Sequence, residues 1–364
     1  MAVMLPLVLI VLGALGFLAS AAGSGGIMPS WVKPAADGEG LAFAGEVSVT
    51  VAQDGSGNYT SIVAALAAAP KSKTRYTVRI REGTYVEQLN ITRHNVTLWG
   101  DGMGKTVITG NRGSPDKNYM LSSATVMTYG MHAAALGRGF MARDLTIQNT
   151  AGVDGNQSLA LRSNSQHTVL YRCGLDGFQD TLYAENKRQF YLDCDISGTV
   201  DLIFGDAKAV FQGCRLLVRR PKEGAHNVIT AQGRDRPGYV QSGFSFQNCS
   251  VIAMPNENLT GVETYLGRPW RNHSHVIFME SFLDGIVHPS GWVHWDKNNP
   301  RFGDEKTVGY MEYNNRGPGA NTTGRINWEG FSVPDAKKAE EYTVDRFING
   351  SWWLPKELNY NHGL

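Results

Sequence analysis

Two aspartates and two glutamines stand in three short segments whose residue types could carry out acyl transfer. The segments are Gln157-Ser-Leu-Ala-Leu-Arg162, Gly177-Phe-Gln-Asp-Thr-Leu-Tyr183 and Val200-Asp-Leu-Ile-Phe-Gly205. Two carboxyl groups that lie close together titrate as a coupled pair, with one ionised and the other protonated near neutral pH. The ionised carboxylate can act as a nucleophile and the protonated one as a general acid. Two amides aimed at a common point can stabilise an oxyanion, by roughly 3–4 kcal/mol per donor.

The spacing of these residues predicts how the chain brings them together. Asp180 and Asp201 are 21 residues apart, and Gln157 and Gln179 are 22 apart. A step of about 20–25 residues equals one coil of a parallel β-helix, whose stacked strands lie ~4.8 Å apart. The four side chains would then rise on one face of three consecutive coils. A β-sandwich, the alternative, does not predict matched polar positions.

A purely structural role is the alternative for each of these polar residues. Buried Asn and Gln ladders are ordinary in β-solenoids, and Asp is common at turns. We favour catalysis because all three segments fall in register.

The elements that must position the site are short and rich in β-forming residues. From Val47 onward, such runs alternate with Gly, Asn and Asp, which is typical of an all-β protein. We expect helices only at Tyr59 to Ala69, which Pro70 stops, and at Asp335 to Glu341, in a cap over the last coils. The expected strands include Tyr76–Ile80, Asn95–Trp99, Phe190–Leu192, Leu202–Phe204 and Val276–Met279. The prediction is an all-β, right-handed parallel β-helix with a short N-terminal helix and with C-terminal loops and a helical cap.

Two aromatic segments suggest a carbohydrate substrate. Leu266-Gly-Arg-Pro-Trp270 sets a guanidinium beside an indole, which suits binding a carboxylate and stacking on a sugar ring. Gly291-Trp-Val-His-Trp295 adds further aromatic surface, although core packing is an equal alternative for Trp295. Arg268 follows Asp201 by 67 residues, about three coils, which places it ~15 Å away by stacking alone. It must therefore come from a coil that bulges or a loop that folds back.

Composition limits the classes of function. The 364 residues carry a formal net charge of +1, with a pI near 7.7, which gives no basic footprint for nucleic-acid binding. The apolar run from Val3 to Leu18, followed by Ala19-Ser-Ala21, predicts a signal peptide over residues 1–22, with a retained membrane anchor as the alternative. Residues 23–46 read as a linker, and 47–364 as the catalytic domain.

Sequons and cysteines agree with secretion. The Asn-X-Ser/Thr sequons are at Asn58, Asn90, Asn95, Asn156, Asn248, Asn258, Asn272, Asn321 and Asn349. The four cysteines could form two bridges in an oxidising compartment. We expect Cys173–Cys194 and Cys214–Cys249, although Cys194 with Cys214 fits adjacent coils equally well. No Cys-X-X-Cys occurs and His is not clustered with Cys, so no metal site is predicted.

At this point the motifs resemble a known family, the plant pectin methylesterases (pectinesterases, carbohydrate esterase family 8). The similarity covers about residues 47–364. The motifs that carry it, in the family's order, are Gly83-Thr-Tyr-Val-Glu87, Gln157 with Ala160-Leu-Arg162, Gly177-Phe-Gln-Asp-Thr-Leu-Tyr183, Val200-Asp-Leu-Ile-Phe-Gly205 and Leu266-Gly-Arg-Pro-Trp270.

The resemblance implies a role for each site residue. Asp201 would attack the C6 carbonyl of methylated galacturonate, and Asp180 would act as general acid and then as general base. Gln157 and Gln179 would form the oxyanion hole, and Arg268 would orient Asp201, keep it ionised and bind substrate. The sugar groove would be lined by Tyr183, Phe204, Trp270 and Trp292. No metal or organic cofactor is implied.

The resemblance also has departures. Ser158 stands where Ala is usual and creates the Asn156 sequon beside Gln157, so we expect Asn156 to carry no glycan in an active enzyme. Met120 replaces a usual substrate-contacting Thr, and residues 127–137 look longer than the family's equivalent. Many plant members carry an N-terminal inhibitor-like pro-domain. The sequence between the leader and Val47 is too short for a full one, so we expect none here, unless the sequence is truncated.

The sequence therefore predicts a secreted, monomeric hydrolase of the plant cell wall that releases methanol from pectin. A proteinaceous pectinesterase inhibitor is a second partner that the resemblance allows for. A β-helix glycoside hydrolase acting on pectin is the nearest rival and would need no amide oxyanion hole. A non-catalytic wall-binding protein is the other rival.

Overall fold

The computed structural model describes residues 47–364 apart from 73, 116–118, 130–137, 238–240 and 297–302. The chain divides into two units, 1–36 and 37–364, and all the described residues belong to the second. The predicted signal peptide and linker lie outside the described residues, as does most of the long segment 127–137.

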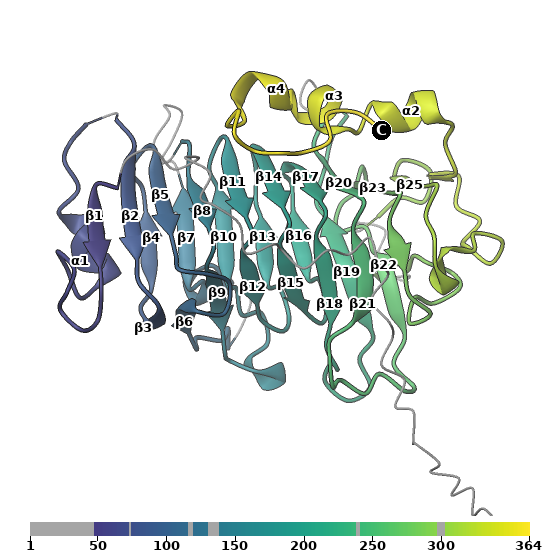
Figure 1. The fold of residues 1–364 in the computed structure, drawn as a ribbon. Coiled ribbons are helices and arrows are strands. Elements are labelled where there is room, and N and C mark those ends of the chain that lie inside the picture. The colour runs from purple at the N-terminus through teal and green to yellow at the C-terminus, as the bar shows by residue number, and fades with distance from the viewer. Residues whose placement is uncertain (1–46, 73, 116–118, 130–137, 238–240, 297–302) are drawn as a thin grey trace, which may run out of the picture. The chain divides into compact units, whose positions relative to one another are not determined.

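Three parallel sheets make up the fold, and successive strands along the chain pass from one sheet to the next (Figure 1). The 11-stranded sheet contains, in spatial order, β1 (Val49–Val51), β2 (Tyr76–Ile80), β5 (Val96–Trp99), β8 (Met141–Arg143), β11 (Thr168–Tyr171), β14 (Arg188–Leu192), β17 (Lys208–Gln212), β20 (Gly243–Gln247), β23 (His275–Met279), β25 (Gly309–Tyr313) and β26 (Phe331–Ser332). The 8-stranded sheet contains β3 (Gly83–Val86), β6 (Thr106–Gly110), β9 (Thr146–Asn149), β12 (Gly174–Asp176), β15 (Asp195–Gly198), β18 (Arg215–Val218), β21 (Ser250–Ala253) and β24 (Phe282–Leu283). The 7-stranded sheet contains β4 (Leu89–Ile91), β7 (Val126–Tyr129), β10 (Leu161–Asn164), β13 (Leu182–Ala184), β16 (Ile203–Gly205), β19 (Asn227–Gln232) and β22 (Thr264–Gly267).

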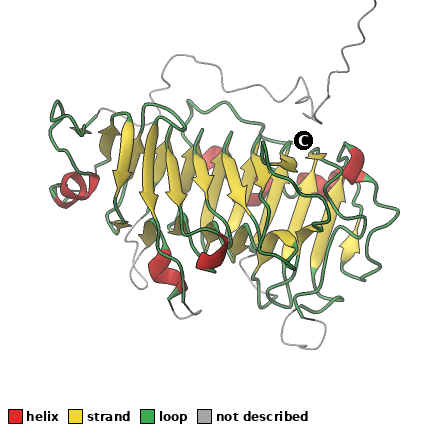
Figure 2. Ribbon diagram, turned by 90° about the horizontal axis from the view of Figure 1, so that it is seen from below, coloured by secondary structure: helices red, strands yellow, loops and turns green. Residues whose placement is uncertain are grey.

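This arrangement confirms the predicted parallel β-helix. From β2 to β24 the strands enter the three sheets in turn, so equivalent residues of successive coils stack. Inside the coils this stacking produces an aromatic ladder, whose neighbouring ring centroids lie 4.5–4.6 Å apart, close to the spacing of parallel strands. The rings belong to Tyr191, Phe211, Phe246 and Phe278. The view in Figure 2 shows the strands of successive coils running side by side, with the helices at the periphery.

The helices are short, and two of them lie where the sequence predicts helices, whereas the expectation of helices at those two places alone is wrong. α1 (Ile62–Ala67) is capped by the Ser61 side chain, and α2 (Ala336–Glu340) by Asp335. Two further helices and three 3-10 turns are α3 (Val344–Ile348), α4 (Gly350–Trp353), η2 (Met120–Ser123), η3 (Val153–Gly155) and η4 (Pro318–Ala320). No described helix is long and apolar enough to cross a membrane.

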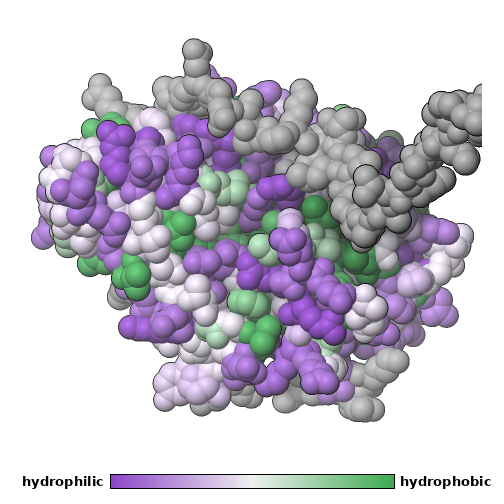
Figure 3. All heavy atoms as spheres, turned by 60° about the horizontal axis from the view of Figure 1, so that its bottom comes forward, coloured by the Kyte–Doolittle hydropathy of each residue, from purple (hydrophilic) through white to green (hydrophobic). Residues whose placement is uncertain are grey.

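The C-terminal helices cover the outer face of the 11-stranded sheet. Apolar side chains of α3, including Val344 and Phe347, pack with Val169, Phe190 and Val210, which β11, β14 and β17 present outward. Figure 1 shows α3 and α4 above the ends of these strands. The outward apolar stripe of this sheet is therefore buried. The face seen in Figure 3 is mostly hydrophilic, and apolar side chains reach its surface in a few patches.

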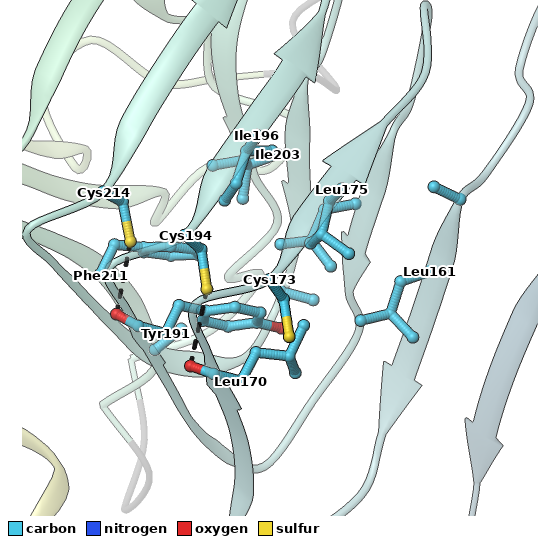
Figure 4. Close-up of a cluster of buried hydrophobic side chains, with 14 of the residues drawn as sticks. Leu161, Leu170, Cys173, Leu175, Tyr191, Cys194, Ile196, Ile203, Phe211 and Cys214 are labelled. Carbon is cyan, nitrogen blue, oxygen red and sulfur yellow. Dashed lines mark hydrogen bonds between the residues drawn. The ribbon is translucent and has the colours of Figure 1, made fainter. Parts of the chain in front are cut away.

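The cysteines occupy the same turn on four successive coils. This two-residue turn joins the 11-stranded to the 8-stranded sheet, and its second residue is Cys173, Cys194, Cys214 or Cys249. All four are buried free thiols, so the predicted disulfides Cys173–Cys194 and Cys214–Cys249 are wrong for this structure. Stacked side chains point the same way, whereas a disulfide needs Cβ atoms directed at each other. The thiols instead donate to carbonyl oxygens, as Cys194 does to Leu170 (Figure 4).

Candidate active site

Asp180 and Asp201 stand at equivalent positions of neighbouring coils, just before β13 and β16. In these paired strands Leu182 stands opposite Ile203, so the two aspartates, each two residues earlier, are level with each other. Their backbones are one strand spacing apart, ~4.8 Å. The Asp180 N–H donates to the Val200 carbonyl at 3.0 Å. Both aspartates have left-handed φ, 64° and 51°. Asp144 and Asp193 share this conformation at other turns of the solenoid, so it belongs to the turn and is not by itself a mark of the site.

Arg268 holds the Asp201 carboxylate in a two-point ion pair. Its Nε donates to Oδ1 at 2.8 Å and its Nη2 to Oδ2 at 2.7 Å. The pair is largely buried, with the two side chains 17% and 7% exposed. This fork geometry fixes the carboxylate plane as well as its charge.

The estimate of three coils between Asp201 and Arg268 is wrong. Opposite Ile203 in β16 stands Thr230 in β19, and opposite Thr230 stands Gly267 in β22. Only two coils therefore separate the residues, because long outward loops lengthen both coils while the strands remain stacked. Two strand spacings, ~10 Å, are within the combined reach of an arginine and an aspartate side chain. No coil needs to bulge.

The second carboxyl group, that of Asp180, has its pKa shifted towards the neutral form. Burial raises the pKa of Asp180 well above its usual value, and the negative charge of Asp201 raises it further. The positive charge of Arg268 and a hydrogen bond from the Gln179 side chain act in the opposite direction. One carboxyl oxygen, Oδ1, is buried without a hydrogen-bond partner in the described part of the chain. A carboxyl group with a raised pKa beside an arginine-paired carboxylate can serve as a general acid next to a nucleophile.

The two predicted oxyanion-hole residues lie on neighbouring coils beside this pair. Gln179 directly precedes Asp180, and the Ser158 N–H donates to the Gln179 carbonyl at 3.1 Å, which brings Gln157 to the same edge of the 7-stranded sheet. Both glutamines are half-buried. The side-chain amides of Gln157 and Gln179 thus lie beside the aspartate pair, where an oxyanion would form.

An aromatic wall continues from the aspartates along the 7-stranded sheet. Tyr183 and Phe204 stack with their ring centroids 4.3 Å apart, and the Trp270 ring meets the edge of Phe204 at 6.0 Å. Tyr183 and Trp270 are only partly buried. Three of the four predicted groove residues therefore lie together. Met120, which stands where the family has Thr, also packs against this cluster.

Trp292, the fourth predicted groove residue, is a core residue. It is 1% exposed, stacks on Tyr310 at 4.2 Å and donates its indole N–H to Glu312. The residue that the sequence reading missed is Trp295, whose ring lies 4.1 Å from the Arg268 guanidinium and stacks near Trp270 at 6.5 Å. The segment 291–293 runs beside β22. Within this segment only Trp292 points inward. Trp295 follows the segment and lies at the site, against Arg268. Residue type alone does not reveal this difference between the two tryptophans.

His226 is a second residue that the sequence reading missed. It precedes β19 and lines a pocket of about 300 Å³ together with Arg220 and Glu263. Burial lowers the pKa of His226, as does the positive charge of Arg268, while Glu263 and Asp201 oppose them. The lowered pKa favours the neutral form of this histidine. No motif in the sequence marks this position.

Known proteins share both the sequence and the fold. A family model described as Pectinesterase matches residues 48–351. The Arabidopsis thaliana protein named probable pectinesterase/pectinesterase inhibitor 17 is 43% identical over 339 residues, 92% of this chain and 64% of that protein. Pectinesterase 2 of Citrus sinensis is 42% identical, over 90% of this chain and 62% of that protein. The chain thus spans less than two thirds of these curated relatives.

Solved structures agree with these matches. Pectin methylesterase from carrot aligns with a TM-score of 0.81 and 40% identity, over 88% of this chain and 98% of that one. A pectin methylesterase from Aspergillus niger aligns with a TM-score of 0.73 and 31% identity, over 85% of this chain and 97% of that one. With the family model covering most of its length, the chain belongs to the pectinesterase family.

Proposed function

We propose that this protein hydrolyses the C6 methyl esters of galacturonate in pectin and releases methanol and pectate. The observation that carries the proposal is the asymmetry of the aspartate pair. Arg268 binds both carboxylate oxygens of Asp201, and the pKa of Asp180 is raised by burial and by Asp201. One carboxyl group is thereby prepared as a nucleophile and the other as an acid.

In the acylation half-reaction, an Asp201 oxygen attacks the ester carbonyl carbon. The carbonyl π electrons move to oxygen, and the Gln157 and Gln179 amides donate to the resulting oxyanion. As the intermediate collapses, the bond to the methoxy oxygen breaks and Asp180 transfers its proton to that oxygen. Methanol leaves, and an acid anhydride remains between Asp201 and the sugar carboxyl group.

In the deacylation half-reaction, Asp180 is a carboxylate and accepts a proton from water. The hydroxide equivalent attacks the galacturonyl carbonyl of the anhydride, and Asp201 departs as a carboxylate. Arg268 receives this leaving carboxylate in its fork. The immediate product is a galacturonic acid carboxyl group, which releases its proton to solvent and becomes a carboxylate. Both aspartates return to their starting protonation states. The aromatic wall of Tyr183, Phe204 and Trp270 supplies flat faces suited to sugar rings.

One assay on methylated pectin tests the proposal against its rivals. Wild-type protein should release methanol without shortening the polymer, and Asp201→Asn should lower the rate by at least about 10³-fold. Asn is isosteric and tolerates the left-handed φ at this position, so the fold is retained. Chain shortening would indicate a glycoside hydrolase. Pectin binding without methanol release, unchanged in the variant, would indicate a binding protein.

The setting follows from the same proposal. The substrate is a cell-wall polymer, so we place the protein outside the cell, in the plant cell wall, where residues 1–22 would serve as its signal peptide. A proteinaceous pectinesterase inhibitor is a candidate partner, because relatives at 43% identity have names that combine both activities. Glycopeptide mapping of active enzyme should find Asn156 unoccupied. Full occupancy there would contradict this expectation.

A further inference from the structure

A buried ion pair joins β25 to the chain that follows η4. The Glu312 carboxylate in β25 accepts from Arg325 Nε at 2.7 Å and from Nη2 at 2.9 Å. The two side chains are 1% and 2% exposed. The guanidinium also donates to the carbonyls of Pro289 and Gly319. Burying such a pair costs several kcal/mol per ion, so it is weak as a source of stability alone.

Trp292 connects this ion pair to the backbone of the site. Its indole N–H donates to Glu312 at 3.1 Å, and its ring stacks on Tyr310. Tyr310 and Glu312 are two residues apart on β25 and so project from the same face. Hydrogen bonds therefore fix the Trp292 ring within its plane, and stacking fixes it perpendicular to that plane. We call Trp292, Glu312 and Arg325 together the Trp292 anchor.

Two backbone hydrogen bonds join the segment that contains Trp292 to Leu266 and Gly267 of β22. The Leu266 N–H donates to the Gly291 carbonyl at 2.6 Å, and the Val293 N–H donates to the Gly267 carbonyl at 3.1 Å. A Cβ on Gly267 would meet the Trp292 ring at 3.0 Å, so the backbone packs directly on the indole. Arg268 is the first residue after β22. The position of the indole thus sets where the arginine leaves the backbone.

The same segment also places the outer contact of Arg268. Trp295 follows Trp292 by three residues, and its ring lies 4.1 Å from the Arg268 guanidinium. Gly291 has φ +69°, and a Cβ there would come within 2.4 Å of Arg325, so the close approach of anchor and segment needs this glycine. Displacement of the anchor would therefore move both the origin of Arg268 and the ring above it.

We propose that the Trp292 anchor positions Arg268 against Asp201, so that Glu312 and Arg325 are positioning residues of the active site. The inference rests on the proposed function, because the anchor affects catalysis by orienting Asp201, the proposed nucleophile, through Arg268. A misplacement of about 1 Å at a reacting group can lower a rate by about 10²-fold.

The first test is Glu312→Gln, which keeps the size of the side chain and removes its charge. We expect kcat for methanol release to fall by about tenfold or more, with KM changed less than about threefold, because substrate contacts are untouched. If this variant does not fold, Trp292→Phe keeps the ring stacking and removes only the N–H. It should lower kcat by several-fold.

The matched control is Asp144→Asn, which breaks an ion pair in the turn between β8 and β9. Asp144 accepts from Arg143 and Arg172 and has φ 53°, a conformation that Asn adopts readily. This variant should lose stability and keep wild-type kcat per folded molecule. If Glu312→Gln behaves in the same way, the anchor is merely structural and the proposal is overturned.

A double-mutant cycle with Arg268→Lys gives a readout that a structural role would not move. If Glu312 acts through Arg268, its substitution should cost much less in the Arg268→Lys background, whereas additive losses would contradict the proposal. Crystal structures test the geometry without any activity assay. Loss of the two bonds from Arg268 to Asp201 in Glu312→Gln is expected, and their retention would overturn the inference. Absence of methanol release by wild-type protein would instead overturn the proposed function.

Discussion

Two stacked ladders in the same β-helix have opposite chemical character. One, the site ladder, consists of Gln179, Asp180 and Asp201 on neighbouring coils at the edge of the 7-stranded sheet. The other, the thiol ladder, consists of the four cysteines in the turns between the 11-stranded and 8-stranded sheets. Both exist because equivalent positions of successive coils become neighbours. Repetition of the backbone therefore does not by itself decide what a ladder can do.

The difference is made by a cation that reaches only one rung. In the thiol ladder, burial raises the pKa of Cys173, Cys194 and Cys214, and each of these thiols donates weakly to a carbonyl, so all three stay neutral and alike. In the site ladder, Arg268 pairs with Asp201 through both carboxylate oxygens, and burial together with the charge of Asp201 raises the pKa of Asp180. A side chain from two coils away thus gives two chemically identical residues different environments, which we propose make one a nucleophile and the other an acid.

The largest expected effect comes from removing the acid of this pair. Asp180→Asn keeps the shape and the left-handed backbone, but its amide cannot protonate methanol or activate water. We expect kcat for methanol release to fall by about 10²–10⁴-fold, the usual range for a general acid–base residue. The variant should remain folded by circular dichroism. Activity within tenfold of wild type would mean that Asp180 is not the general acid and base of the reaction.

A smaller effect is expected at the aromatic wall. Trp270→Ala should raise KM for pectin by about three- to tenfold, corresponding to the loss of one ring-stacking contact of ~1 kcal/mol. Trp352→Ala is the matched control, because this indole is 66% exposed on α4 and is remote from the 7-stranded sheet. Equal effects of the two substitutions would remove Trp270 from the substrate groove.

The sequence predicts the fold and the aspartate pair well because both depend on one-coil spacing. Asp180 and Asp201 are 21 residues apart, and no loop interrupts that coil, so position in the sequence translates directly into position in space. The short capped helices α1 and α2 were also predictable, since Ser61 and Asp335 cap them locally.

The other parts of the site could not be predicted, because their positions depend on long loops and on which face of a sheet a side chain occupies. Arg268 could not be placed by counting residues, because two coils of 27 and 37 residues lie between it and Asp201. Trp292 and Trp295 are three residues apart, and the buried Glu312 decides which of them faces inward. The cysteine spacing was read correctly as a coil repeat, but stacking alone does not direct two thiols at each other.

The charge of Asp180 should also appear in the pH dependence of stability. Its folded-state pKa is raised, so above the unfolded value near 4 the folded protein keeps a proton that the unfolded chain releases, and stability falls as pH rises. Asn mimics the protonated acid at every pH. Asp180→Asn should therefore match wild type near pH 4 and exceed it by ~1–3 kcal/mol at pH 8, measured by denaturant unfolding. A variant that is less stable at pH 8 would contradict a protonated Asp180.

A substitution in the thiol ladder should lower stability rather than raise it, and should have the smallest effect on activity. Cys194→Ala should lower the free energy of unfolding by ~1–2 kcal/mol, because it leaves a small cavity, and should leave kcat within about twofold of wild type. In the native protein, a charged thiol reagent should modify none of the four cysteines, since all are buried and three have a raised pKa. After unfolding without reductant, all four should react. Recovery of only two or none would mean that bridges form after all, and the ladder would then be a covalent staple rather than a set of packed, neutral side chains.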